Sequence, residues 1–134
     1  MTRVLVDSNV LLDVMTADPV WSAWASTALQ EAADDSVLVI NPVVYGEVSV
    51  RYTTAEELDA ALGDLLLREP LPFQAAFLAG KAYVAYRRRG GTRSAPLPDF
   101  WIGAHAAVAQ YRLLTRDPAR YRTYFPSLQL IAPS

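Results

Sequence analysis

Two kinds of segment alternate along this chain, and their alternation limits the fold more than any other feature. Short runs that are continuously apolar and rich in β-branched residues are typical of strands buried on both faces of a sheet. Such runs occupy residues 4–6 and 37–40, and further short strands are expected at residues 113–114 and 128–131. Buried strands of this kind are usually connected by helices that cover the sheet.

Helix start signals stand in the intervening segments. Asp-Pro at residues 18–19 and Asn-Pro at residues 41–42 each join an N-cap residue to a proline at the first helical position. Residues 54–57 form a capping box, and a long helix is predicted from about residue 73 to 89, ending at two glycines. The apolar positions expected to share one face are Trp21, Trp24, Ala25, Ala28 and Ala32 in the first helix, and Leu58, Leu62, Leu65 and Leu66 in the third.

Strands that alternate with helices predict an α/β fold with a central, mostly parallel β-sheet flanked by helices. A length of 134 residues is typical of one domain with a sizeable core, so a single domain is expected over residues 1–134. The composition, 52% hydrophobic and 19% charged, is that of a folded chain. The one loop-like stretch is at residues 90–98.

Cysteine is absent, which excludes a disulfide framework and a thiolate metal site. No apolar run is long enough to cross a membrane, and the first residues do not resemble a signal peptide. A cytoplasmic protein without membrane contacts is therefore expected.

Charge is divided unevenly along the chain. Residues 1–80 carry 3 basic and 12 acidic side chains, whereas residues 81–134 carry 9 basic and 2 acidic ones. This division predicts a polar molecule with one anion-binding region, unless the fold interleaves the two halves and mixes their charges.

Four carboxylates stand at positions suited to chemistry. Asp7 follows the first strand directly, and Asp117 follows the strand at residues 113–114. Because ligands of parallel sheets lie beyond the carboxyl ends of the strands, these two acids are expected at one edge. Glu47 lies among valines on a helix, and Asp99 opens the apolar helix "DFWIGAHA".

Each acid also has a purely structural interpretation. Asp7 and Asp99 are placed to stabilise helix N-termini. Glu47 is spaced for an ion pair with Arg51, four residues on, and Asp117 belongs to an Asp-Pro turn.

Taken together, the acids favour a metal site. Carboxylates gathered in one pocket repel one another and need a cation to remain ionised. Mg²⁺ or Mn²⁺ is the natural choice, because it prefers oxygen ligands and can activate water against a phosphodiester. A carboxylate pair for glycoside hydrolysis is an alternative, although no sugar-binding aromatic platform accompanies it.

Four segments in this order resemble the PIN-domain ribonucleases, and more closely the VapC toxins of bacterial toxin–antitoxin pairs. These segments, which together span nearly the whole chain, are "VLVDSNVLLD" (residues 4–13), "NPVVYGEV" (41–48), "LPDFWIGAHA" (97–106) and "LLTRDPARYRTYFPSLQLIAP" (113–133).

The resemblance implies a PIN-like domain with the activity of a Mg²⁺- or Mn²⁺-dependent endoribonuclease. Carried over by motif, Asp7 and Asp99 are the main metal ligands, while Glu47 and Asp117 complete the set through a second metal or through water. The polar residues expected to steady these acids are Ser8, where many relatives have threonine, Asn9 and Thr115.

The resemblance also implies partners: an RNA substrate, a small antitoxin that covers the acidic site, and a second copy of the chain in a homodimer. The acidic N-terminal half, with its two-tryptophan helix, suits such contacts. RNA phosphates are expected at Arg87, Arg88, Arg89 and Arg93, with Arg112, Arg116, Arg120 and Arg122 as the alternative path.

Two other functions remain open on the residues alone. An aspartate-nucleophile phosphatase would use Asp7, but the second aspartate usual in that family is here Asn9. A non-catalytic interaction domain would use all four acids as caps. His105 and the three tryptophans, Trp21, Trp24 and Trp101, are expected in the core or at an interface.

Overall fold

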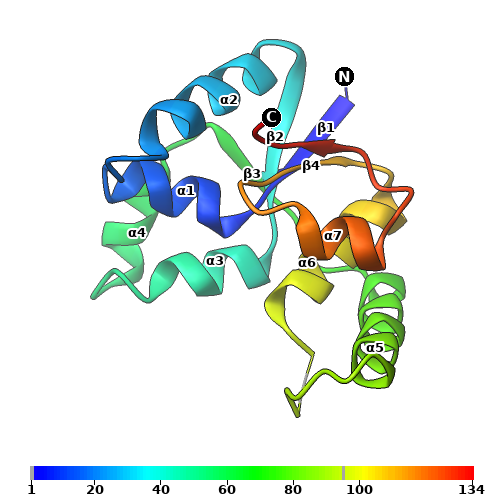
Figure 1. The fold of residues 1–134 in the computed structure, drawn as a ribbon. Helices are drawn as coiled ribbons and strands as arrows, with labels where there is room; N and C mark the ends of the chain where they lie inside the picture. The colour runs from blue at the N-terminus through cyan, green and yellow to red at the C-terminus, as the bar shows by residue number, and fades with distance from the viewer. Residues whose placement is uncertain (1, 95) are drawn as a thin grey trace.

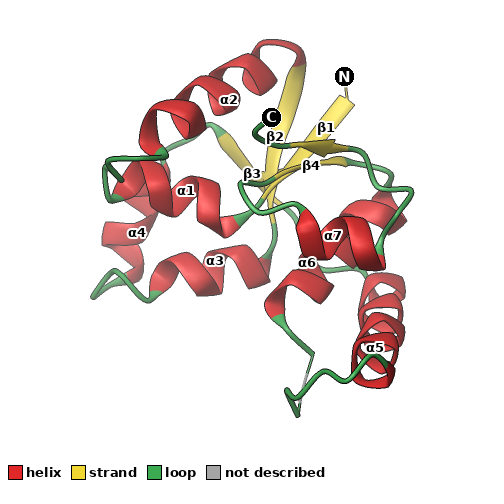
Figure 2. Ribbon diagram, in the orientation of Figure 1, coloured by secondary structure: helices red, strands yellow, loops and turns green. Residues whose placement is uncertain are grey.

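The computed structural model describes residues 2–94 and 96–134, which form five strands and seven helices (Figures 1 and 2). Ala95, within the loop predicted at residues 90–98, and Met1, within the predicted domain, lie outside the described residues. The strands are β1 (Thr2–Val6), β2 (Ser36–Ile40), β3 (Leu66–Arg68), β4 (Arg112–Leu114) and β5 (Leu130–Ile131). The helices are α1 (Ser8–Met15), α2 (Ser22–Asp35), α3 (Pro42–Ser49), α4 (Ala55–Leu62), α5 (Phe73–Arg88), α6 (Pro98–Ala109) and α7 (Ala119–Tyr124).

The five strands form one sheet in the order β3-β2-β1-β4-β5, and every neighbouring pair is parallel. The predicted α/β class is therefore confirmed. In the central strand, Leu5 lies opposite Val39 of β2 and Leu113 of β4. The chain winds outward from β1 in one direction through β2 and β3, and in the other through β4 and β5. The boundary between β1 and β4 is thus a topological switch point, where α/β sheets bind their ligands.

The core lies between the sheet and the helices that surround it (Figure 2). Val4, Leu5 and Val6 of β1 have no exposed surface, as expected for a strand covered on both faces. Helices α1 and α2 pack against each other, as do α5 and α6. The alanines predicted for the inner face of the first helix are buried in α2.

Local capping explains where two helices begin. The Asn41 side chain accepts a hydrogen bond of 2.9 Å from the Val44 amide at the start of α3, and Pro42 takes the first helical position. The Thr54 hydroxyl accepts one of 3.2 Å from the Glu57 amide at the start of α4. Both starts are as predicted, and the predicted long helix at residues 73–89 is α5.

Other predicted boundaries were wrong. The helix predicted to start at Asp18 and Pro19 begins instead at Ser22, as α2. The Asp18 carboxylate accepts hydrogen bonds from the backbone amides of Val20 and Trp21 and so caps a separate turn before the helix. Helix α4 ends at Leu62, since Gly63 adopts a φ of 64°, a left-handed value that suits glycine.

The two leucines predicted to continue that helix lie beyond it, with Leu66 in β3. Neither β3 nor α7 was predicted from the sequence, and β5 covers only the last two residues of the predicted 128–131 strand.

The strand order keeps the two halves of the chain apart. Strands β3, β2 and β1 come from the acidic half and β4 and β5 from the basic half. Figure 1 shows α1 to α4 gathered on the left of the view and α5 to α7 at the lower right. The two halves therefore lie side by side, and the ion pairs Arg112–Asp35 and Arg116–Asp13 join them. None of the helices in the described ranges has the length and apolarity to cross a bilayer.

Candidate active site

Asp7 lies at the switch point of the sheet. It follows the last residue of β1, and its amide donates a hydrogen bond of 2.9 Å to the Leu114 carbonyl at the end of β4. Its side chain makes no cap hydrogen bond to α1, although the residue occupies the N-cap position. With 3% of its surface exposed, Asp7 points instead into the protein. Capping therefore does not account for this carboxylate.

The two oxygens of Asp7 are bonded unequally. Oδ2 accepts hydrogen bonds of 2.8 Å from the Thr115 hydroxyl, 2.8 Å from the Tyr121 hydroxyl and 3.4 Å from the Asn9 amide. Among the described side chains, the one near Oδ1 is that of Ser8, whose hydroxyl lies 3.5 Å away. One oxygen is thus fixed by three donors, whereas the other retains most of its capacity for a ligand.

Glu47 extends from α3 toward Asp7. Its Oε1 accepts a hydrogen bond of 2.8 Å from the Ser8 hydroxyl, so Ser8 stands between Asp7 and Glu47. In the described residues no ion pair links Glu47 to Arg51, and the i,i+4 interpretation is not supported. A hollow of about 390 Å³ opens beside this acid, and its lining consists of Leu12, Thr16, Glu47, Val50 and Arg51.

Asp99 completes a group of three acids. It lies in the first turn of α6, where the helix dipole favours a negative charge, and α6 has no side-chain cap. Its Oδ1 lies 3.4 Å from the Tyr121 hydroxyl, and its Oδ2 accepts a hydrogen bond of 3.1 Å from Arg120. Tyr121 therefore stands between Asp7 and Asp99, as Ser8 stands between Asp7 and Glu47.

Asp117 lies apart from these three acids. Its side chain is 71% exposed, and its nearest charged partner is Arg116, at 3.7 Å. Only its backbone joins the site, because the Asp117 amide donates a hydrogen bond of 3.2 Å to the Thr115 hydroxyl. The structure thus brings together three of the four predicted acids.

The predicted supporting residues gather around Asp7, and Ser8 links it to Glu47. Asn9 donates from its amide nitrogen to both Asp7 and Thr115, while its amide oxygen accepts from the Arg116 backbone. Ser8 and Thr115 are buried hydroxyls bonded to the acids, as described above. All three side chains predicted to steady the acids therefore contact Asp7.

Burial and the charges of neighbouring acids oppose ionisation of Asp7 and Glu47. Removal from water raises the pKa of Asp7, as does the charge of Asp99, although the hydrogen bonds from Thr115 and Tyr121 work in the opposite direction. Burial likewise raises the pKa of Glu47, together with the charges of Asp7 and Asp99. Burial and the three acids raise the pKa of Tyr121 far above its usual range, so its phenol stays protonated and donates.

The carboxylate oxygens of this site are the type of ligand that a hard divalent cation prefers. Across residues 2–94 and 96–134, no three Asp, Glu or His side chains make a compact group able to enclose a metal ion, and hydroxyls occupy the spaces between the acids. Mg²⁺ does not need such a cage, because it is commonly bound by one or two carboxylates and keeps several of its waters. Oδ1 of Asp7 and the partly exposed carboxylate of Asp99 are oxygen donors of the type that Mg²⁺ prefers.

Tyr121 is the site residue that sequence reasoning missed. It stands between two arginines in "ARYRTYF", and its apolar spacing to Phe125 at i+4 is the one local signal of its burial. Nothing in that pattern indicates that its hydroxyl meets residues far earlier in the chain.

The predicted arginine cluster is exposed and unpaired by acids. Arg87, Arg88, Arg89 and Arg93 lie at the end of α5 and in the following loop, and none of them forms a salt bridge within the described ranges. Arg89 lies over the Tyr124 ring at 5.7 Å, which places it beside α7.

In the alternative arginine group, three members are already paired. Arg112 meets Asp35, Arg116 meets Asp13, and Arg120 meets Asp99. The exposed cluster therefore has more capacity for phosphate than the alternative path.

His105 and the tryptophans occupy structural positions. His105 is buried, and its Nδ1 lies 3.1 Å from the Asn41 side-chain amide. Burial lowers its pKa, which keeps the ring neutral. Trp21 and Trp24 meet edge to face with ring centroids 6.3 Å apart, and Trp101 packs against the core.

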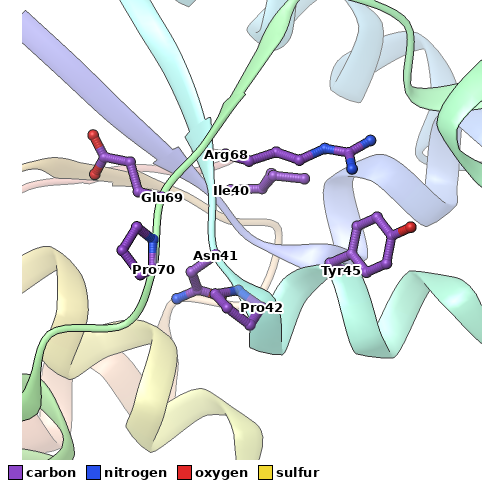
Figure 3. A pocket seen from close by; sticks show the side chains of 7 residues that line it. All are labelled: Ile40, Asn41, Pro42, Tyr45, Arg68, Glu69 and Pro70. Atoms are coloured by element: carbon purple, nitrogen blue, oxygen red, sulfur yellow. The ribbon is translucent and has the colours of Figure 1, made fainter.

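A pocket of about 300 Å³ lies at the carboxyl ends of β2 and β3 (Figure 3). Figure 3 shows the side chains of Tyr45 and Arg68 on one side and that of Glu69 pointing away from them. The first two both bind Asp59, and Glu69 accepts a hydrogen bond from Tyr111. This pocket contains none of the four predicted acids.

The parallel sheet and the acids at its switch point place this protein in a class: α/β domains with an acidic site at the carboxyl edge of the sheet. The PIN domain family model matches residues 4–126, so the chain belongs to the PIN domain family. No match was found among curated proteins.

Solved structures of similar fold cover almost the whole chain. VapBC2 from Rickettsia felis, bound to a DNA fragment from its promoter, has a TM-score of 0.75 at 16% identity, covering 98% of each chain. VapBC-1 from nontypeable Haemophilus influenzae has a TM-score of 0.73 at 18% identity, again covering 98% of each. A toxin–antitoxin complex from Klebsiella pneumoniae has a TM-score of 0.66 at 20% identity and the same coverage.

Proposed function

We propose that this PIN domain is a Mg²⁺- or Mn²⁺-dependent endoribonuclease and the toxin of a toxin–antitoxin pair. The observation that carries the proposal is the convergence of Asp7, Glu47 and Asp99 at the switch point of the sheet. Burial and the charges of neighbouring acids raise the pKa values of Asp7 and Glu47, and a divalent cation relieves the repulsion among the acids.

Asp7 and Asp99 are the proposed ligands, with Glu47 acting through water or a second ion. When bound, the metal ion supplies charge neutralisation at the phosphodiester and a lower pKa for a coordinated water. Asn9 and Thr115 hold Asp7 in place through their hydrogen bonds, while the Ser8 hydroxyl donates to Glu47 and lies 3.5 Å from Asp7. Asp117, exposed at the rim, is proposed to take part through water or through a second ion.

RNA is the proposed substrate, and the exposed cluster of Arg87, Arg88, Arg89 and Arg93 is the proposed phosphate contact. Four positive side chains at the end of one helix and the following loop attract the backbone of a nucleic acid. One of them, Arg89, lies over the Tyr124 ring of α7, and this helix carries two residues bonded to Asp99, which supports a path from the cluster to the acids.

A small antitoxin and a second copy of the chain are the proposed protein partners. Structures of similar fold include toxin–antitoxin complexes. Exposed apolar side chains on α5, Phe73 at 93% and Phe77 at 69%, offer contact area for another chain. Purification together with the product of a short neighbouring reading frame, followed by measurement of the mass of the complex, tests both partners.

The central experiment measures RNA cleavage by the purified chain with Mg²⁺, with Mn²⁺ and with excess EDTA, beside the variant Asp99→Asn. Cleavage is expected with either metal and is expected to stop in EDTA, because the acids alone supply no activated water. The variant is expected to lose cleavage by at least about 10²-fold, the order seen when an electrostatic group is removed from an active site.

The fold of the variant is expected to survive, because asparagine keeps the size of this partly exposed side chain, whose hydrogen bonds within the described residues go to Arg120 and Tyr121 and not to the α6 backbone. Undiminished cleavage in EDTA contradicts the proposal. A fall in the melting temperature of the variant that is large enough to account for its loss of cleavage also contradicts the proposal, since it indicates a structural role for Asp99.

A phosphatase reaction through Asp7 has less support. Oδ2 of Asp7 accepts hydrogen bonds from three donors, and the residue is 3% exposed. Asn9, at the position of the second aspartate of that family, links Asp7 to Thr115. Trapping of a phospho-aspartate would favour that reaction. An interaction domain without catalysis predicts neither metal binding nor cleavage of any RNA.

A further inference from the structure

We infer that Tyr121 is a positioning residue for the metal site, whose phenol sets the orientation of Asp7 and the distance between Asp7 and Asp99. The inference rests on the proposed metal dependence. The Tyr121 hydroxyl lies 2.8 Å from Oδ2 of Asp7 and 3.4 Å from Oδ1 of Asp99, and these two acids are far apart in the sequence. Within the described residues, Tyr121 is the side chain that hydrogen-bonds to both.

The phenol is suited to this position because it is a neutral donor. A lysine or arginine between the two acids would neutralise them and compete with a cation. A tyrosine hydroxyl provides one proton to the pair and leaves their negative charge in place. Together with Thr115 it occupies Oδ2 of Asp7, so Oδ1, which has one contact of 3.5 Å, is the oxygen left for a ligand.

Packing fixes the Tyr121 ring. The residue is 1% exposed, and α6 presents Gly103 to α7 at this point. A Cβ atom at Gly103 would lie 2.5 Å from Cε2 of Phe125 and 3.0 Å from Cδ1 of Tyr121. Glycine therefore allows α7 to approach closely enough for the phenol to reach the acids.

The hydroxyl is not needed to fill space, so its removal isolates its effect on the acids. Tyr121→Phe keeps the ring and deletes one oxygen atom. Partners that orient metal ligands typically change metal affinity by about 10- to 100-fold when removed. The variant is therefore expected to bind Mn²⁺ at least about 10-fold more weakly than the original chain.

Mn²⁺ affinity is measured without RNA, by calorimetry or by the electron paramagnetic resonance signal of free Mn²⁺, on the whole chain. Tyr124→Phe is the matched control, because it lies on the same helix and its hydroxyl makes no hydrogen bond within residues 2–94 and 96–134. The control is expected to retain full affinity. A second readout, the rise in melting temperature on adding Mn²⁺, should be smaller for Tyr121→Phe than for the control.

Equal Mn²⁺ affinity in Tyr121→Phe and the original chain overturns the inference while leaving the proposed nuclease intact. A lower melting temperature with unchanged affinity also overturns it, because that pattern indicates a purely structural hydroxyl. Failure of the original chain to bind Mn²⁺ overturns the proposed metal dependence and this inference together.

Discussion

Arg120 lies 3.1 Å from Oδ2 of Asp99, so α7 contacts this carboxylate with two consecutive side chains. Tyr121 binds Oδ1 as a neutral donor, whereas Arg120 binds Oδ2 as a cation. The two contacts have opposite consequences for metal binding. The phenol leaves the charge of Asp99 available, while the guanidinium partly satisfies it.

The first prediction follows from that competition. Arg120→Gln removes a cation that a metal ion has to displace, so Mn²⁺ affinity is expected to rise. Partly exposed ion pairs are worth up to about 1 kcal/mol, which limits the gain to roughly fivefold. Titration with Mn²⁺ in the absence of RNA measures the change.

Arg122→Gln is the control for this titration, because Arg122 is on the same helix and forms no ion pair in the described part of the chain. The control is expected to leave affinity unchanged. A weaker affinity in Arg120→Gln would show that Arg120 supports the site instead of competing for it.

The second prediction concerns the exposed arginine cluster. Replacing Arg87, Arg88, Arg89 and Arg93 by glutamine should weaken RNA binding and make it less sensitive to salt. For single strands the logarithm of the binding constant changes by about −0.7 for each neutralised phosphate per unit of log salt. The slope is therefore expected to flatten by up to about 3 units if each arginine meets one phosphate.

Binding is measured against salt concentration in an Asp99→Asn background, which prevents cleavage. Arg112→Gln is a useful comparison, since Arg112 is already bonded to Ser36 and Asp35. An unchanged slope in the fourfold variant would show that the cluster is a solvated helix end.

The third prediction concerns pH and the cost of burying Asp7. An acid whose pKa is higher in the folded than in the unfolded state binds protons more readily when folded. Stability therefore falls as pH rises from the ordinary value of 3.8 through the raised native pKa. In metal-free solution at neutral pH, the ionised Asp7 is a net cost, and Asp7→Asn should melt at a higher temperature than the original chain.

The advantage of the variant should shrink as pH is lowered through the raised pKa of Asp7 toward 4. Each unit of that shift is worth about 1.4 kcal/mol, or roughly 5 °C in a domain of this size. Thermal melts in a chelator from pH 4 to 8 measure the difference between the two proteins, which removes contributions from His105 and other shared groups. A difference that does not vary with pH would contradict the prediction.

Much of this fold could be read from local patterns. The apolar run at residues 4–6 and the Asn-Pro start of α3 depend on residues within a few positions of one another, so their outcome was predictable. Motif and position likewise marked Asp7, Glu47 and Asp99 as candidate site residues, and the structure brings these three acids together. Strand β3 was missed because a strand of three residues gains its order from pairing with β2.

Proximity between distant residues was beyond local patterns. Asp117 and Asp99 are both acids at strand or helix ends, yet the Asp-Pro turn leaves the Asp117 side chain 71% exposed while Asp99 joins the site. Tyr121 reaches Asp7, 114 residues away in the sequence, because Gly103 lets α7 approach α6. Capping and periodicity act within one or two turns and fix each element alone, whereas close packing between elements fixes which side chains meet.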